Sequence, residues 1–108
     1  MLTNKQIKKI KVKKSDSQFP LIFEALGDQG RFNTFKLLTE RRGLCVTEIA
    51  RVFDITTSAA SQQLKILERA GLVQRMRMGL MIWYQVNLKT PRTKQLIKLF
   101  EGSGKKMK

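Results

Sequence analysis

The spacing of apolar residues changes along this chain just after Gly71. Up to that residue, apolar side chains recur every three or four positions, as they do on one face of an α-helix. Two short runs follow, Val73 to Met78 and Met81 to Val86, which are rich in β-branched, aromatic and methionine residues and are separated at Gly79. Such runs predict a β-hairpin, so we expect a mostly α fold with one small hairpin (α+β).

Four helices are expected before the hairpin and one after it. Asp28 suits the N-cap of the second helix, and Thr57 or Ser58 suits the N-cap of the fourth. Pro91 suits the first turn of the last helix, whose apolar stripe continues to Phe100. The expected helices cover residues 20–26, 28–40, 47–53, 57–70 and a segment from 91 onward, with a turn over 54–56.

The chain is strongly basic, and the charge is concentrated at its ends. Twenty-two Lys and Arg against eight Asp and Glu give +14 over 108 residues; residues 1–14 hold six lysines and residues 105–108 hold three. This length allows one domain. We expect a flexible basic arm or poorly anchored helix over 1–18, a folded domain over 19–101 and a flexible tail over 102–108. Such charge suits nucleic acid, although an anionic membrane surface would attract it too.

Composition argues against several functional classes. The chain has no histidine, which removes the commonest general base and the usual imidazole metal ligand. It also has no paired-carboxylate motif and no phosphate-cradling glycine loop, so we expect neither an enzyme nor a cofactor. The single cysteine excludes an internal disulfide, and no apolar run approaches the roughly 18 residues of a membrane span. No secretory signal follows the first lysines, so we expect a cytoplasmic protein without a membrane partner.

The stretch from Thr47 to Leu72, TEIARVFDITTSAASQQLKILERAGL, has the pattern of a helix-turn-helix. The second helix of such a unit brings its first turn close to base edges, which favours small or amide side chains. Glutamine amides can pair with adenine, and a lysine can contact a phosphate. The candidate DNA-binding residues of this helix are therefore Thr57, Ser58, Ser61, Gln62, Gln63 and Lys65.

Two arginines of the hairpin extend this candidate site. Arg75 and Arg77 are two residues apart, so they project from the same face of the strand, where they can contact phosphates or a minor groove. For either arginine alone, a solvated strand face is the competing interpretation. For Thr57 and Ser58, the competing interpretation is that they only cap the helix.

These segments together resemble the ArsR/SmtB family of winged helix-turn-helix repressors over roughly residues 20–100. The similarity is carried, in order, by ALGDQGRFNTFKLL, GLCVTEIA, TTSAASQQLKILERAGLV and a wing ending in WYQV. The stretch from Thr57 to Val73 is the most specific part. The resemblance implies a recognition helix over Thr57–Lys65, a wing over residues 73–87, and a protein that occupies an operator until an inducer weakens its binding.

The resemblance also implies a homodimer in which the first and last helices of the domain pack across a two-fold axis. Two short amphipathic helices with little core of their own independently favour such pairing. A dimer of this kind reads double-stranded DNA at a pseudo-palindrome whose half-sites lie about 34–36 Å apart. In this chain the interface would comprise Phe19, Ile22, Phe23, Leu96, Leu99 and Phe100.

The chain departs from the family at its metal-binding positions. Many members carry cysteine–valine–cysteine where this chain has Cys45, Val46 and Thr47, so one thiolate remains where zinc needs three or four ligands. The final helix lacks the histidines of the other familiar site. We therefore expect no metal at the family's sites. Cys45 is either an inert buried side chain or a redox sensor.

The wing is unusual as well. Its tip, Met78-Gly79-Leu80-Met81, is apolar where basic residues would be typical, which favours a protein or membrane contact over strong DNA contacts there. Met76, Met78 and Met81 carry thioethers, which suit copper(I), although methionines at such spacings usually serve packing.

Two functions remain in competition. The first is a sequence-specific DNA-binding transcriptional regulator, a homodimeric repressor released by an unidentified signal. The second is a nonspecific nucleic-acid-binding or winged-helix protein-interaction module, which the basic ends and the apolar wing tip favour. The second predicts binding that is indifferent to sequence and lost at moderate salt.

Overall fold

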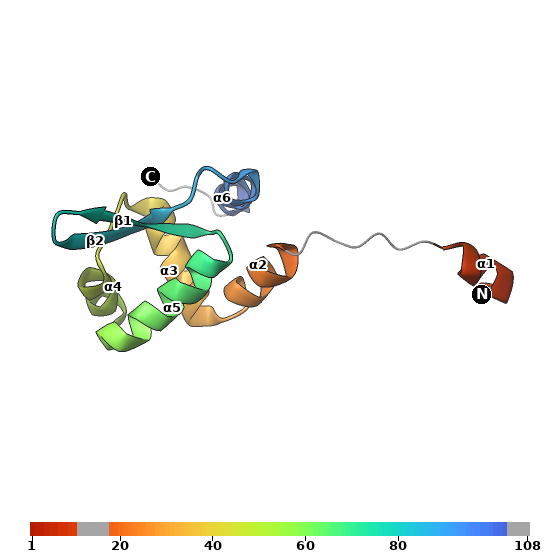
Figure 1. Ribbon diagram of the computed structural model, residues 1–108, viewed down its shortest axis with the longest axis horizontal. Helices are drawn as coiled ribbons and strands as arrows, with labels where there is room; N and C mark the ends of the chain where they lie inside the picture. The colour runs from red at the N-terminus through yellow and green to blue at the C-terminus, as the bar shows by residue number, and fades with distance from the viewer. Residues whose placement is uncertain (11–17, 104–108) are drawn as a thin grey trace.

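The computed structural model describes residues 1–10 and 18–103, with side chains described as far as residue 101 (Figure 1). Within these ranges the chain forms six helices and one antiparallel two-stranded sheet. In order they are α1 Asn4–Lys9, α2 Gln18–Leu26, α3 Gln29–Glu40, α4 Val46–Phe53, α5 Thr57–Arg69, β1 Val73–Met78, β2 Met81–Val86 and α6 Pro91–Ser103. The predicted α+β architecture is confirmed.

The N-terminal helix α1 was expected only as an alternative to a flexible arm. Thr3 and Gln6 cap it reciprocally: each side chain accepts a hydrogen bond from the other residue's backbone N–H, at 2.9 and 3.1 Å. All its side chains are exposed. Residues 11–17 of the expected arm, and 104–108 of the expected tail, lie outside the described residues, so the flexibility of both segments stays a prediction.

Most predicted boundaries of the domain hold. Asp28 caps α3 as expected, accepting a hydrogen bond from the Arg31 N–H at 3.0 Å, and both strands have the predicted ends. Three helix N-termini differ from expectation: α2 begins at Gln18, two residues early, α4 begins one residue early, and the N-cap of α5 precedes the two expected residues. Cys45 is the N-cap residue of α4, and its N–H donates to Glu48 Oε1 at 3.0 Å, so the helix begins before Thr47. Thr56 caps α5, in place of the expected Thr57 or Ser58.

One hydrophobic core holds α2 to α5 and the base of the hairpin together. The contacts run mainly between α5 and its neighbours α2, α3, α4 and β1. Because α5 packs against four elements, its position and orientation are fixed, and only one face of the helix remains exposed. The buried apolar residues are Ile22, Ala25, Phe35, Leu38, Ile49, Ala50, Ala60, Leu64, Leu67, Ala70, Leu72 and Val73.

One glycine separates α5 from the hairpin, and a second glycine lies in the turn at the hairpin tip. Gly71 ends α5 with a φ of +80°, and the N–H of Leu72 returns to the Leu67 carbonyl at 3.0 Å. At the tip Met78 pairs with Met81 across a two-residue turn, in which Gly79 has a φ of +66° and Leu80 a negative φ. Glycine in the first central position is the signature of a type II′ turn, whose twist matches that of the strands.

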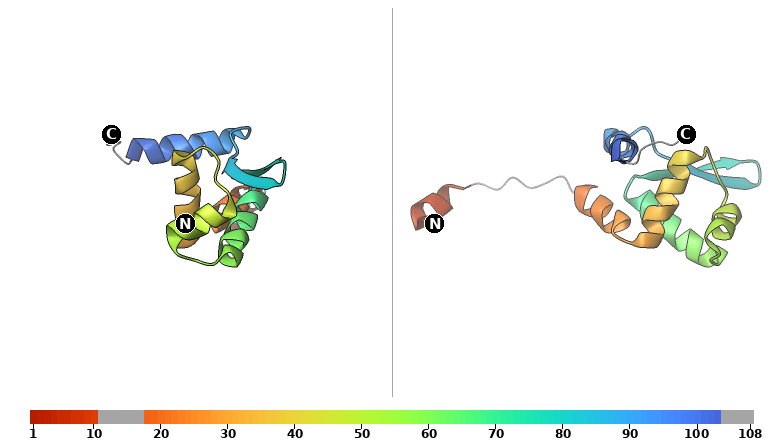
Figure 2. Two further views of the ribbon diagram at one scale, coloured as in Figure 1. Left: turned by 90° about the vertical axis from the view of Figure 1, so that its left-hand side faces the viewer. Right: turned by 180° about the vertical axis from the view of Figure 1, so that it is seen from behind.

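The last helix closes the domain on the side away from α4 and α5 (Figure 2). The Thr93 hydroxyl, buried at the start of α6, donates to the Gly71 carbonyl at 3.3 Å. Farther along, the Phe100 ring meets the rings of Phe32 and Phe35 edge-on, with centroids 5.3 and 6.0 Å apart. The order of helices, the helix-turn-helix pair α4–α5 and the following hairpin make this the predicted winged helix-turn-helix.

We predict that Leu64→Ala lowers the free energy of unfolding by about 2–5 kcal/mol, because Leu64 is fully buried on α5 and its truncation leaves a cavity. Urea denaturation at fixed protein concentration measures the loss. Leu80→Ala is the matched control, since Leu80 is 95% exposed at the hairpin tip and should change stability by no more than about 0.5 kcal/mol. Equal effects would contradict the assignment of the core.

Candidate nucleic-acid interface

Helix α5 presents a polar face to solvent. Thr57, Ser58, Ser61, Gln62 and Lys65 are all exposed, whereas Ala60, Leu64 and Leu67 on the other side are fully buried. Each of these exposed residues lies three or four positions from another of them, which places them on one face of the helix. The structure therefore brings together five of the six residues predicted on this helix.

At the start of α5, the side chains of Thr57 and Ser58 are available to a ligand because another residue caps the helix. The Thr56 hydroxyl accepts the hydrogen bond of the Ala59 N–H at 3.0 Å and so fills the capping role. Thr57 and Ser58 lie inside the first turn and are not needed as caps. This position weakens the interpretation that they serve only to begin the helix.

Gln63 lies apart from the exposed row. Its Oε1 accepts a hydrogen bond from the Thr34 hydroxyl of α3 at 2.8 Å, and the side chain is half-buried. A Cβ placed on Gly30 would come within 2.6 Å of the Gln63 Nε2, which shows how closely α3 packs there. Gln63 thus has a structural partner, and the expectation that it reads bases loses support, because its amide oxygen is turned toward the protein.

The turn between α4 and α5 is tightly defined. Asp54 ends α4 in the left-handed conformation, with φ 54° and ψ 49°, and its short polar side chain makes this region accessible. The N–H of Ile55 donates to the Ala50 carbonyl at 3.0 Å. These bonds fix the angle at which α4 supports α5, as a helix-turn-helix requires.

The hairpin places Arg75 and Arg77 on one face, as predicted, because their cross-strand partners are Tyr84 and Ile82. Both arginines are exposed. Arg75 Nε lies 3.8 Å from Glu68 Oε2 of α5, an exposed ion pair of small energetic value. Arg77 Nε donates to the Gly79 carbonyl at 3.3 Å. Neither contact prevents the guanidinium from meeting a phosphate, because its remaining N–H groups are free to donate.

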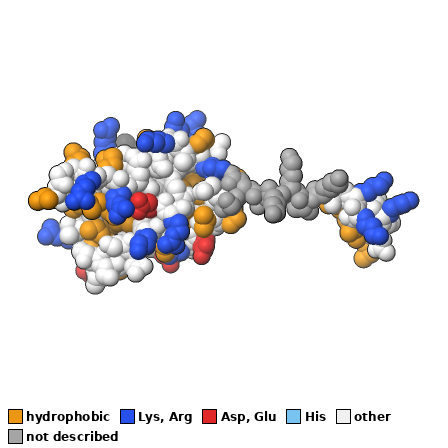
Figure 3. All heavy atoms as spheres, viewed as in Figure 1, with side chains coloured by type: hydrophobic (Ala, Val, Ile, Leu, Met, Phe, Trp, Pro, Cys, Tyr) orange, Lys and Arg blue, Asp and Glu red, His pale blue; other side chains and the backbone are white. Residues whose placement is uncertain are grey.

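Lysine and arginine side chains outnumber acidic ones on the face shown in Figure 3, and hydrophobic side chains protrude at its left-hand end, where Figure 1 places the hairpin tip. Leu80, Met78 and Met81 are 95%, 61% and 47% exposed there. This face of the molecule is therefore mainly basic, and the tip of the wing is apolar.

The six predicted dimer residues divide into two groups. Phe19, Phe23 and Leu99 are exposed, at 43%, 68% and 62%. Ile22 is only 3% exposed and belongs to the chain's own core, and Leu96 and Phe100 pack against that core. The Phe19 and Phe23 rings stack with centroids 6.2 Å apart, and the Arg92 guanidinium of α6 lies 5.2 Å from the Phe19 ring centre, which brings α2 and α6 together.

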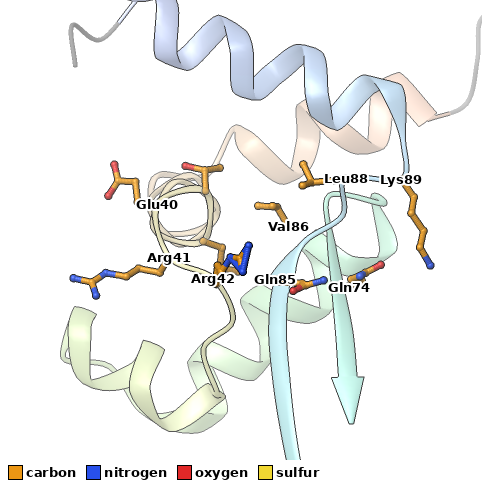
Figure 4. Close-up of a pocket in the computed structure, with 10 residues that line it drawn as sticks. Glu40, Arg41, Arg42, Gln74, Gln85, Val86, Leu88 and Lys89 are labelled. Carbon is orange, nitrogen blue, oxygen red and sulfur yellow. The ribbon is translucent and has the colours of Figure 1, made fainter. Parts of the chain in front are cut away.

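A hollow of about 630 Å³ lies between the C-terminal end of α3 and the hairpin (Figure 4). Its apolar lining comes from Leu38, Val86 and Leu88. Figure 4 shows Gln74 and Gln85 side by side on neighbouring strands, while Arg41 and Glu40 extend away from the strands. The hollow mixes amide, cationic and apolar groups without a cluster of catalytic side chains.

Cys45 is half-buried, with its Sγ 3.2 Å from the Thr47 hydroxyl. In the described part of the chain, no three Cys, Asp or Glu side chains gather as a metal-binding group. None of the described helices has the length and apolarity that a bilayer span requires.

Sequence reasoning missed two residues that position the site. Arg31 of α3 donates from Nε to the Ala25 carbonyl at 2.9 Å and from a terminal nitrogen to the Glu24 carbonyl at 3.1 Å, fastening the end of α2. Thr34 is fully buried and holds Gln63. The sequence offers a clue to Thr34, because a polar residue stands there at a position that helical spacing places in the core. The sequence offers no clue that Arg31 bonds to the carbonyls at the end of α2.

Comparisons with known proteins agree with this geometry. The sequence pattern of the bacterial regulatory protein, arsR family, matches residues 28–75, which include α3, α4 and α5. The arsenical resistance operon repressor of Bacillus subtilis is 35% identical over 65 residues, covering 60% of this chain and 62% of that repressor. An HTH-type transcriptional regulator of Methanocaldococcus jannaschii is 34% identical over 80 residues, covering 74% of this chain and 88% of that protein.

A solved structure supports the fold. The homodimeric winged helix-turn-helix DNA-binding domain of a possible ArsR-family regulator from Mycobacterium bovis superposes with a TM-score of 0.70 at 23% identity, covering 86% of this chain and 89% of that domain. The shared fold, the sequence pattern across the helix-turn-helix and the archaeal relative matched over most of its length lead to one conclusion: this chain belongs to the ArsR family of bacterial regulatory proteins, which are DNA-binding transcriptional regulators.

Proposed function

We propose that the protein is a homodimeric transcriptional repressor of the cytoplasm that reads a pseudo-palindromic operator with α5. The observation that carries this proposal is the polar face of α5. It combines small hydroxyl side chains at the first turn, the exposed Gln62 amide and the Lys65 ammonium, and the helix is held from behind by the core. The name of the Bacillus repressor supports repression as the direction of control.

The dimer is supported by the apolar side chains that α2 and α6 leave uncovered. Phe23 and Leu99 are 68% and 62% exposed, and large aromatic side chains exposed in this way are typical of protein–protein contacts. The solved Mycobacterium bovis domain of the same fold is a homodimer. A two-fold axis here would repeat α5 in successive major grooves, about 34–36 Å apart.

Lys65→Ala should weaken binding to all DNA sequences to a similar extent and reduce the slope of log affinity against log salt by about 1, because one phosphate contact is lost. Arg75→Ala should act in the same direction. Fluorescence anisotropy over a salt series measures both. Lys98→Ala, which removes the same charge from an exposed position on α6, is the control. An equal fall in slope for Lys98→Ala would show that overall charge, and not the α5 face, governs binding.

Gln62→Ala should instead narrow the gap between specific and random DNA by about 1–3 kcal/mol, if the amide makes a bidentate base contact. The specific duplex is obtained by selecting genomic fragments that the wild-type protein retains. Gln95→Ala, at an exposed position on α6, is the matched control. An unchanged specificity ratio for Gln62→Ala would remove this residue from the base-reading set.

Phe23→Glu should weaken dimerisation at least about tenfold, because it places a charge in a contact that otherwise buries an aromatic ring. Sedimentation equilibrium measures the dissociation constant, and circular dichroism checks that the monomer stays folded. Leu80→Glu, which introduces the same charge at the exposed wing tip, should leave the dimer intact. A wild-type protein that is monomeric at micromolar concentration would contradict the proposed assembly.

A further inference from the structure

The hairpin gathers soft sulfur ligands on one face. Met78 pairs directly with Met81, and Met76 pairs with Trp83. Alternation along each strand puts residues 76 and 78 on the same side as residues 81 and 83. This set, which we term the thioether face, therefore contains three methionines around the single tryptophan of the chain.

The packing interpretation of these methionines does not hold for two of them. Met78 and Met81 are 61% and 47% exposed, and both lie outside the hydrophobic core. Directly opposed Cβ atoms on antiparallel strands lie about 4.5–5.5 Å apart, and each methionine sulfur lies two bonds beyond its Cβ. Met76 is diagonal to Met81, at about 7–8 Å, a separation that long side chains still bridge. The flexible methionine side chains therefore allow all three sulfur atoms to reach one ion.

The electrostatics of the thioether face suit a soft monovalent cation. No Lys, Arg, Asp or Glu occupies residues 74, 76, 78, 81, 83 or 85, which share this side of the hairpin, whereas Arg75 and Arg77 project from the other side. Thioethers are neutral, soft ligands that select copper(I) over hard or borderline divalent ions. An indole ring can offer its face to a cation held by neighbouring ligands, and Trp83 lies directly across the hairpin from Met76.

We propose that Met76, Met78 and Met81 form a binding site for copper(I), with Trp83 beside the ion. The site needs no histidine and no second cysteine. Its ligands come from the hairpin and not from the family's cysteine motif, although the backbone pair of Leu44 with Tyr84 places Cys45 next to β2. Because a thioether has no proton to lose on binding, the affinity of this site is independent of pH in the range where a cysteine thiol would be progressively protonated.

Silver(I), a soft monovalent cation that air does not oxidise as it oxidises copper(I), is the probe. The full chain carrying Cys45→Ser is titrated with silver(I) while the fluorescence of Trp83 is followed. This substitution removes the competing thiol, and serine is a good N-cap residue for α4. We expect quenching that saturates at about one equivalent. The affinity should be the same at pH 5.5 as at pH 7, because thioether ligands have no proton to lose in this range.

Met78→Leu and Met81→Leu, each made in the Cys45→Ser chain, should weaken silver(I) binding at least about tenfold. Substituting a residue that only orients a metal ligand typically lowers the affinity about 10- to 100-fold, and removing the ligand itself should cost at least as much. Leu keeps the size and apolarity of the exposed side chain, so the hairpin stays intact. Leu80→Ala is the control that should leave binding unchanged, and zinc(II) should cause no quenching.

Either of two results would overturn the proposal. The first is a loss of quenching in the Cys45→Ser chain, which would assign the metal to the thiol. The second is undiminished binding in the chain with Leu at 76, 78 and 81, which would assign it elsewhere. Neither readout involves DNA, so the result is separate from that of the proposed regulatory function.

Discussion

The burial of one face of α5 is the interaction on which the rest of the structure depends. Ala60, Leu64 and Leu67 are completely removed from solvent, and α2, α3, α4 and β1 all pack against this helix. At roughly 25 cal/mol per Å² of apolar surface, such burial outweighs the exposed Arg75–Glu68 ion pair, which contributes about 1 kcal/mol at most. A helix held in this way presents its opposite face rigidly, and rigid presentation is what base recognition requires.

Polar contacts refine this arrangement. Thr34 holds Gln63 against α3, Thr56 caps α5, and Arg31 fastens the end of α2. The bonds of Thr34 and Arg31 join elements whose relative angles set the distance between α5 and the α2–α6 surface where we place the two-fold axis. The same domain thus carries two differently built surfaces: the polar face of α5, which we propose for DNA, and the apolar α2–α6 surface, which we propose for a second copy. The thioether face of the wing is chemically distinct from both.

The sequence predicted much of this fold because local signals agreed with tertiary packing. Both strands have their predicted ends, since Gly71 and Gly79 mark turns that need positive φ. The N-cap of α5 was misassigned because three adjacent residues, from Thr56 to Ser58, can each cap a helix. Gln63 and Ile22 were assigned to surfaces because helical spacing locates a face only to within about one residue, and the packing of α3 and α2 decides which flanking side chain turns inward.

Binding of the wild-type protein to DNA from upstream of its own gene, compared with a scrambled duplex at two salt concentrations, tests the central claim most directly. Sequence-specific reading by α5 predicts a preference of about a thousandfold or more that survives near-physiological salt. If that region holds no operator, fragments selected from the whole genome take its place. Equal affinity for selected and scrambled duplexes, lost as salt rises, would contradict specific recognition and leave a nonspecific nucleic-acid-binding protein.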